Sequence, residues 1–561
     1  MAYDTNNSTI AMDTAERGLK KHKMSTFTVV FMIFSLVAAG CYGIEDMIPE
    51  SGPGLTLILL IVLPFVWGLP FGLVASELGS ARPQEGGYYK WVQEALGEFW
   101  GFQAGWWRTI SIYIDNTLYV VLAGGYLAGL FHFNELQKYG FMAAMILVFM
   151  YINIRGVRDV GIVTNALSIF VIAAFTMVAV VGFMNWGGNP FEPITAYPIE
   201  ASSDWFFYIG AGLSIGMWMY SGYESMSTIA GELEDPQVIS RATIISVPII
   251  MATYIVPTLA ALSAFKGAGE EFSFLNWGSD AGEGVIGYAT LPEHFVAPAL
   301  GIFFGVVAIV AQCSIFNTYI ASGSRGFFAL ADDNLAPKFM VKVDKKHGVP
   351  YVAVISVAVV NLILCRIDFS VLVVVDVFLL VSSYILVYIS AMKLRKTIPP
   401  EDYKFKTPGG YKFLCVICVI PICIAFFSFL VNGTDYFIGG MAGIITGPVL
   451  YAIWKRFFGG LAKKDPVNNP VNPKTRLARG DMKRMSFLFL ILGLVGVGGS
   501  FFLPWYEADW SFPDDYDMTL FGSQEAMWTG IRIATAIALA LALVFYLVWK
   551  KVDDAKDEKA A

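Results

Sequence analysis

The amino-acid sequence predicts an all-α integral membrane protein with about 14 transmembrane helices, because its apolar residues fall in long runs separated by short polar loops. Of its 561 residues, 56% are hydrophobic and 15% are charged, and the mean hydropathy is +0.61. A soluble protein of this length would need far more polar surface to cover its core. Basic and non-basic loops alternate along the chain, which is typical of repeated membrane crossing.

Each expected span is a stretch of about 20 mostly apolar residues, the length a helix needs to cross roughly 30 Å of hydrocarbon. The stretch at 99–131 is long enough to require a tilt or an extension beyond the bilayer, whereas those at 139–154 and 350–366 are short. The expected spans are 26–48, 55–78, 99–131, 139–154, 160–185, 204–231, 243–265, 292–322, 350–366, 369–393, 411–431, 434–455, 485–505 and 526–549.

Lys and Arg concentrate in every second loop, and cytoplasmic loops are the ones enriched in these residues. The N-terminal tail is basic, the loop at 187–203 contains no Lys or Arg, and the loop at 506–524 is acidic. Because the alternation continues along the whole chain, we expect an even number of spans and both termini in the cytoplasm. The expected location is the plasma membrane.

The loops and spans together predict the organisation of the chain. Two sets of five spans are followed by two further spans, a polar linker and two additional helices that look like an appendage to the working core. The expected segments are a cytoplasmic tail at 1–24, the first set at 25–200, the second set at 201–400, spans eleven and twelve at 401–457, the cytoplasmic linker at 458–484, the additional helices at 485–549 and a cytoplasmic tail at 550–561.

Reactive groups are sparse in this sequence. The common hydrolase, metalloprotease and phosphate-binding motifs do not occur. Cys415 and Cys418 form a C-x-x-C inside an expected membrane helix, with no histidine or second pair nearby, which favours ordinary apolar packing. The four histidines lie in tails or loops without metal-ligand spacing: His22, His132, His294 and His347. We therefore expect no enzyme, no metal, no cofactor and, without a basic surface, no nucleic-acid partner.

Two expected spans combine glycine and a carboxylate in mid-span, span one at 39–46 and span six at 218–225. Glycine weakens a helix, and interrupted helices at matching positions of two halves indicate a transporter site. Unwound backbone exposes N–H and C=O groups that can bind a solute in place of water. The alternative for each glycine is a helix-packing contact.

Charged residues inside the spans are the other candidates, because a charge at mid-membrane costs about 2.5–3.5 kcal/mol on insertion scales. Glu45 and Asp46 have an alternative place at the outer water interface. Arg108 and Asp115 are two helical turns apart on one face, where the alternative role is mutual neutralisation. The candidates are Glu45, Asp46, Arg108, Asp115, Glu224, Asp376 and Arg532.

Five short segments form a recognisable set: Gly43-Ile44-Glu45-Asp46, Glu85-Gly86-Gly87-Tyr88-Tyr89-Lys90-Trp91, Phe99-Trp100-Gly101-Phe102-Gln103-Ala104-Gly105-Trp106, Ile114-Asp115-Asn116-Thr117-Leu118-Tyr119 and Tyr223-Glu224-Ser225-Met226-Ser227-Thr228-Ile229-Ala230-Gly231-Glu232. Together they resemble the amino acid–polyamine–organocation permease superfamily, and most closely its polyamine:proton symporter branch. The resemblance implies a LeuT-like core of ten helices in two inverted five-helix repeats.

The resemblance also implies a solute site between spans one, three, six, eight and ten. Trp218 and Tyr223 resemble the aromatic gates of relatives, and Glu224 matches a carboxylate position that serves pH sensing or proton coupling in several of them. The residues thereby assigned to substrate binding are Gly40, Cys41, Tyr42, Gly43, Ile44, Glu45, Asp115, Tyr119, Trp218, Tyr220, Ser221, Gly222, Tyr223, Ser225, Asn317 and Asp376.

The chain departs from the family pattern at the first break. Many amino acid permeases have Gly-Ser-Gly there, whose small residues let backbone N–H groups reach the substrate carboxylate, whereas this chain has the bulkier Cys41-Tyr42-Gly43. The nearby acidic residues suit a cationic amine, by ion pairing and by cation–π contact with tyrosines.

We therefore expect a permease that moves amino acids or polyamines across the plasma membrane by alternating access. Its partners are the small solute, protons and membrane lipid, with sodium as the alternative coupling ion. A buried carboxylate with few partners can carry a proton near neutral pH, and Glu224 is the first choice and Asp115 the second. The alternative functions are an exchanger of an amino acid for its amine and, from another class, a channel or membrane sensor.

Overall fold

The computed structural model describes residues 23–38, 41–84, 86–235, 237–278, 285–367, 369–473, 475–507 and 523–551. Most of the chain in these ranges is helical, and the β pairing found there is an isolated bridge between Trp277 and Ile286. Gly40 and most of the two expected tails, at 1–24 and 550–561, lie outside the described residues.

The helices follow one another along the chain with short connections. The 3-10 and π turns are η1 (Pro64–Gly68), η2 (Ser225–Glu232), η3 (Glu270–Phe272), η4 (Phe274–Asn276), η5 (Lys338–Val341), η6 (Pro400–Asp402) and η7 (Gly460–Lys463). The α-helices are α1 (Thr26–Val37), α2 (Ile44–Ser51), α3 (Pro53–Leu63), α4 (Leu69–Ala81), α5 (Gly87–Leu96), α6 (Glu98–Phe131), α7 (Glu135–Ile154), α8 (Val157–Met184), α9 (Ser202–Met219), α10 (Gln237–Phe265), α11 (Thr290–Phe295), α12 (Pro298–Asp332), α13 (Tyr351–Leu364), α14 (Phe369–Thr397), α15 (Gly410–Val431), α16 (Thr434–Phe458), α17 (Arg479–Tyr506) and α18 (Gln524–Lys551).

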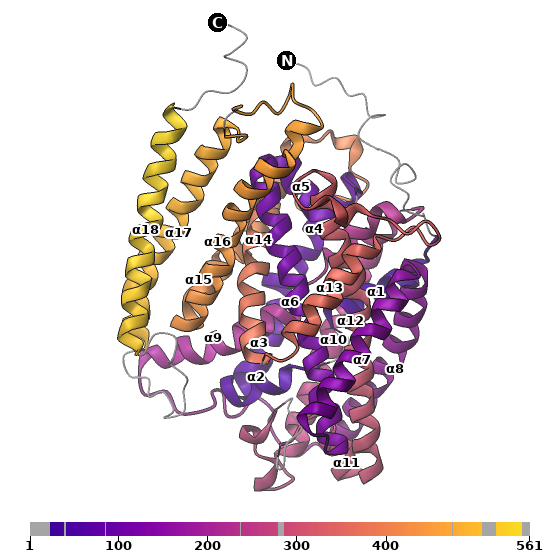
Figure 1. Cartoon of the computed structure of the whole chain (residues 1–561). Coiled ribbons are helices and arrows are strands. Elements are labelled where there is room, and N and C mark those ends of the chain that lie inside the picture. Colours follow the sequence, from indigo (N-terminus) through magenta and orange to yellow (C-terminus); the bar gives the residue numbers. More distant parts are fainter. Residues whose placement is uncertain are drawn as a thin grey trace, which may run out of the picture.

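The predicted multi-pass helical architecture is confirmed. Eleven helices in the described ranges are long and apolar enough to cross a membrane, and α1 and α13 are shorter apolar helices. Every expected span falls on a helix or on a helix with a break, and Figure 1 shows the long helices gathered into one bundle with α17 and α18 beside each other at its edge.

Several helix boundaries differ from those expected, and one helix is additional. The eighth span begins at Pro298, because the chain turns between α11 and α12 and proline suits the first turn of a helix. The loop before α6 contains the additional helix α5, whose apolar face is buried. The last span pair begins earlier, at Arg479, because the Asp481 carboxylate accepts the Ala478 N–H and so caps a polar first turn.

The long helix α6 lies at the centre of the bundle and packs along α12 and α14. Gly105 on α6 lies against Leu330 of α12, and the Ala104 carbonyl accepts a hydrogen bond from the Ser383 hydroxyl of α14. Small residues allow this close approach of membrane helices. As a result, residues of α6 reach both of the broken spans.

The second span is wound more loosely at η1, a π turn that begins with Pro64 between α3 and α4. π turns occur where the regular hydrogen-bond ladder is interrupted, often near functional sites. Trp67 in this turn donates its indole N–H toward the Met217 carbonyl at 3.1 Å and the Ser221 hydroxyl at 3.0 Å. The second span therefore fixes the end of α9.

The predicted appendage is tied to the rest of the bundle at both ends of α17. At one end, the buried Lys455 ammonium of α16 contacts Glu98 at 2.6 Å and Asp481 at 2.8 Å. At the other end, the Glu507 carboxylate accepts the N–H and the hydroxyl of Thr434, each at 2.6 Å. Charges at both ends attach α17 to α16, while α18 packs against α17.

Replacing Lys455 with methionine leaves Glu98 and Asp481 without their shared cation, so we expect a loss of about 3–5 kcal/mol of stability. Thermal unfolding of the purified protein in detergent measures the change. The triple variant K455M/E98Q/D481N should recover most of it, because the two buried charges are then removed. Arg241→Ala, in an exposed ion pair, is the control and should change stability by about 0.5 kcal/mol or less. An unchanged K455M would contradict the role of this cluster.

Candidate functional site

The first span is broken, as predicted. α1 ends at Val37 and α2 begins at Ile44, with Cys41 to Gly43 in a turn between them. Gly43 has φ +95°, a left-handed conformation that glycine adopts most easily, and an added Cβ would lie 2.9 Å from the Trp218 ring. Gly43 therefore allows both the turn and the close approach of Trp218.

The sixth span is also broken, directly before the predicted carboxylate. α9 ends at Met219, and regular winding resumes in η2 at Ser225. Gly222 has φ +109° and donates its N–H to the Tyr384 hydroxyl at 2.9 Å. A side chain on α14 thus satisfies a backbone group that the break releases, as burial in a membrane protein requires.

One tyrosine outside the predicted set joins the two breaks. The Tyr254 hydroxyl on α10 lies 2.7 Å from the Val37 carbonyl at the end of α1 and 3.0 Å from the Met219 carbonyl at the end of α9. Both carbonyls belong to final helical turns, where intrahelical partners are missing. Tyr254 therefore holds the two interrupted spans side by side.

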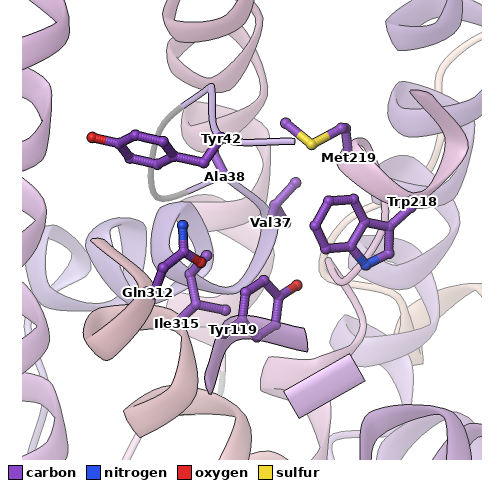
Figure 2. A pocket seen from close by; sticks show the side chains of 8 residues that line it. All are labelled: Val37, Ala38, Tyr42, Tyr119, Trp218, Met219, Gln312 and Ile315. Carbon is purple, nitrogen blue, oxygen red and sulfur yellow. The ribbon is translucent and has the colours of Figure 1, made fainter. Parts of the chain in front are cut away.

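A small cavity lies between the breaks. Its volume is about 10 Å³, which leaves room for about one water molecule. Figure 2 shows Trp218 and Met219 on one side of it and Tyr42 and Gln312 on the other. The lining residues are Val37, Ala38, Tyr42, Tyr119, Trp218, Met219, Gln312 and Ile315.

Two stacked aromatic rings, Tyr119 and Trp218, form one wall of the cavity. Tyr119 stacks on Trp218 with ring centroids 5.8 Å apart, and its other neighbour is Tyr319 of α12 at 5.6 Å. The Trp218 indole N–H donates to the Asp115 carboxylate at 2.8 Å. Stacked aromatic faces next to a carboxylate are suited to an organic cation.

The sequence offered mutual neutralisation as one role for Arg108 and Asp115. In the structure, the direct partner of Arg108 is Glu224. The Arg108 guanidinium Nε lies 2.5 Å from Glu224 Oε1, and both side chains are buried. The Tyr384 hydroxyl donates to the other oxygen of Glu224 at 2.6 Å. The expectation of a carboxylate with few partners is therefore wrong for Glu224, because the turn of the sixth span directs it toward α6 and α14.

The network continues from Arg108 to Asp376. Arg108 donates to the Ser111 hydroxyl at 2.7 Å, and Ser111 donates to Asp376 Oδ1 at 2.6 Å. The Ser225 hydroxyl of η2 lies 3.3 Å from Arg108. The structure thus brings Asp376 and Ser225 into one cluster with Glu224.

Glu45 lies at the start of α2, buried and away from the Arg108 cluster. Its carboxylate accepts the Tyr126 hydroxyl at 2.8 Å and the Tyr288 backbone N–H at 2.9 Å. Glu45 does not lie at the water interface, the alternative position considered for it, because only 3% of the residue is exposed. Asp46 is half-buried. Ile44 is the first residue of α2 and is buried in the hydrophobic core.

Several predicted residues support the breaks from outside the cavity. Cys41 lies with its Sγ 2.8 Å from the Thr253 carbonyl, and Tyr220 donates to the Leu60 carbonyl at 2.9 Å. Ser221 donates to the Met217 carbonyl at 2.6 Å, and Tyr223 is fully buried. These side chains are therefore placed to fix the shape of the interrupted segments.

Asn317 is not brought to the cavity. Its side-chain amide contacts the Val160 carbonyl and Thr164 of α8, both at 3.3 Å, and its carbonyl oxygen accepts from Asn153 of α7 at 3.1 Å. α12 turns this residue toward α7 and α8, so the expected position in the solute site is wrong on geometric grounds.

Sequence reasoning missed some of the residues that shape the site, namely Gln312, Tyr254, Tyr319, Tyr384, Ser111, Tyr126 and Tyr288. Gln312 carried a usable signal, because an amide in the middle of an apolar span is costly unless it has a role. The tyrosines carried none, since a tyrosine in a membrane helix is common and its contacts depend on helix rotation.

The chain is similar in sequence to known transporters. The chain is 29% identical over 406 residues to a probable polyamine transporter of Arabidopsis thaliana, spanning 72% of this chain and 78% of the relative. It is 26% identical over 471 residues to the serine/threonine exchanger SteT of Bacillus subtilis, spanning 79% of this chain and 99% of the relative.

A solved structure shares the fold. MhsT, in complex with L-phenylalanine, superposes with a TM-score of 0.55 at 15% sequence identity, covering 73% of this chain and 99% of MhsT. The predicted LeuT-like fold class is thereby confirmed. The family model for amino acid permeases matches residues 24–453. The protein therefore belongs to the amino acid permease family, a family of multi-pass secondary transporters.

Proposed function

We propose that this permease carries a cationic organic amine of the polyamine class across the plasma membrane, coupled to protons, by alternating access. The observation that carries the proposal is the chemistry of the cavity wall. Aromatic faces and hydrogen-bond acceptors surround a small space between two broken helices, and Asp115 accepts the indole N–H of Trp218, which lines that space. Such a wall supplies what an ammonium group needs when it leaves water.

Two acceptors at the cavity are without partners within the described part of the chain. They are the Tyr42 hydroxyl oxygen and the Gln312 carbonyl oxygen, both buried. A buried polar atom without a hydrogen bond costs about 1–3 kcal/mol, which a bound donor removes. A primary or secondary amine brings several N–H donors for the Gln312 oxygen, whereas the Tyr42 hydroxyl points away from the cavity in Figure 2.

The charges also favour an amine over a zwitterionic amino acid. The carboxylate of an amino acid would need donors, but the Arg108 guanidinium of this cluster is already paired with Glu224. In addition, the first break presents the Tyr42 side chain next to the cavity, where a smaller residue would leave more backbone open. An amine instead finds the Asp115 carboxylate next to Trp218.

The volume of the cavity supports alternating access. A space of about 10 Å³ has room for one water molecule and for no polyamine, so binding requires the two interrupted segments to move apart. We infer that the first and second sets of five spans are inverted repeats, that α1 and α9 move against α6 and α12, and that both termini face the cytoplasm.

The relatives support the substrate class and supply the second candidate. The Arabidopsis relatives are described as polyamine transporters, which agrees with the acidic and aromatic cavity. SteT is described as a serine/threonine exchanger, so exchange of solutes is the second candidate function.

Proteoliposomes separate these possibilities. With an inward proton gradient and no solute inside, labelled spermidine should accumulate, because a symporter needs only the gradient. Leucine is the matched control solute and should not accumulate. Uptake that requires preloaded solute would instead establish an exchanger, and uptake of leucine without spermidine would contradict the amine proposal.

Asp115→Asn removes the proposed counter-charge while keeping an acceptor for the Trp218 N–H. A charge-assisted hydrogen bond is worth about 1.5–3 kcal/mol, so the affinity for spermidine should fall roughly 10- to 100-fold. Calorimetric titration in detergent measures the dissociation constant. Asp435→Asn, on an exposed position, is the isosteric control and should bind as the unmodified protein does. Equal affinities for both variants would exclude Asp115.

Gly222→Ala tests whether the second break must keep its shape. The residue has φ +109°, and a Cβ would lie 2.8 Å from the Leu36 carbonyl oxygen, so strain of about 1–3 kcal/mol is expected. We expect a lower melting temperature and at least tenfold slower spermidine uptake. Gly140→Ala, where a Cβ meets nothing within 4 Å, is the control. Normal uptake by Gly222→Ala would show that the break tolerates a side chain.

A further inference from the structure

Three carboxyls and one guanidinium are buried near the cavity, to which Asp115 is linked through Trp218. They are Arg108 and Asp115 on α6, Glu224 in the second break and Asp376 on α14, each at most 1% exposed. Ionised throughout, this cluster would carry two uncompensated negative charges, and burying such a charge costs several kcal/mol. At least one of the carboxyls therefore holds a proton in the closed structure.

Hydrogen bonds identify Glu224 as an ionised member. Its two oxygens accept from two different donors, the Arg108 guanidinium at 2.5 Å and the Tyr384 hydroxyl at 2.6 Å. A carboxylate in direct contact with a guanidinium is the favoured form of such a pair. Glu224 thus neutralises Arg108, and the carboxyl that holds a proton is Asp115 or Asp376.

Asp376 differs from the others in having an oxygen without a partner. Its Oδ1 accepts the Ser111 hydroxyl, and its Oδ2 is buried with no hydrogen-bond partner within the described part of the chain. Ser111 has a single hydroxyl proton and itself accepts from Arg108, so it can donate only to Asp376. The vacant oxygen is therefore the position where a carboxyl proton fits.

The proton position is separate from the solute cavity. Ser111, Asp115 and Tyr119 follow one another at four-residue intervals on one face of α6, and only Tyr119 among them lines the cavity. Because Asp376 bonds Ser111, it contacts α6 about two helical turns before Tyr119, the residue of this face that lines the cavity. A solute can occupy the cavity without displacing a proton from Asp376.

The charged and titratable neighbours of Asp376 come from several elements packed against α14. From α6, the charges of Arg108 and Asp115 and the phenol of Tyr119 interact with it. The second break contributes Glu224, and α12 contributes Tyr319. On the far side of α14, α15 and α16 present apolar contacts at Phe378, which packs on Phe429 and beside Gly440.

We propose that Asp376 is the proton-binding residue of coupled transport in this permease, carrying its proton on Oδ2 while the site is closed. The assignment rests on the proposed proton-coupled function and replaces Glu224, the first choice from the sequence. When the second break moves, Arg108, which already donates to Ser111, can turn from Glu224 toward Asp376, and the Asp376 carboxyl then releases its proton to water. Movement of one segment thereby links proton release to opening of the cavity.

Infrared difference spectroscopy of the purified protein tests the protonation directly. At neutral pH the unmodified protein should show the C=O stretch of protonated carboxyls, from which Asp376→Asn removes one component, whereas Asp376→Glu shifts that component but retains it. Asp435→Asn, on an exposed position, is the control and should leave the band unchanged. A band that is the same in Asp376→Asn as in the unmodified protein would overturn the assignment.

Transport provides the second measurement. With one proton per solute, a gradient of about one pH unit corresponds to roughly tenfold accumulation, so Asp376→Asn should lose about tenfold of its spermidine accumulation and all of its pH dependence. Asp376→Glu should restore part of the pH dependence, and Asp435→Asn should keep all of it. A pH dependence retained in Asp376→Asn would overturn the proposal. If the unmodified protein accumulates no amine, the substrate proposal fails, while the infrared band still decides the state of Asp376.

Discussion

The need to satisfy backbone polar groups inside a membrane governs this structure. Two helices stop in mid-bundle, and the carbonyls and N–H groups they release require partners where water is scarce. Tyr254 contacts the last carbonyls of both α1 and α9, and Tyr384 accepts the Gly222 N–H. These two hydroxyls satisfy the backbone groups of both breaks, and they connect the breaks to α10 and α14.

The scarcity of water also makes the ionisation of the buried cluster depend on its hydrogen bonds. Tyr384 bonds both the released N–H of Gly222 and the Glu224 carboxylate, so the geometry of the break and the ionisation of the cluster depend on each other. Because Glu224 belongs to the break itself, movement of this segment changes the surroundings of Arg108 and, through Ser111, those of Asp376. A transporter needs such a connection between shape and charge.

The scaffold around the site is held by close packing and by buried ion pairs. α6 contributes Asp115 and Tyr119 to the site and, at its first turn, the Glu98 carboxylate that pairs with Lys455. The helix that supplies much of the cavity wall is thereby anchored to α16 and α17. The last two helices of the chain are thus part of the support of α6, in addition to packing on each other.

The sequence by itself determined the membrane class, the position of the spans, the two breaks and the polar residues available to the site. These properties are local: hydropathy, glycine and charge act over one or two helical turns. Only the tertiary structure decided that Arg108 pairs with Glu224, that Asn317 turns toward α7 and α8, and that tyrosines on α10, α12 and α14 complete the site. Such pairings depend on how each helix is rotated about its axis, which packing against distant segments sets.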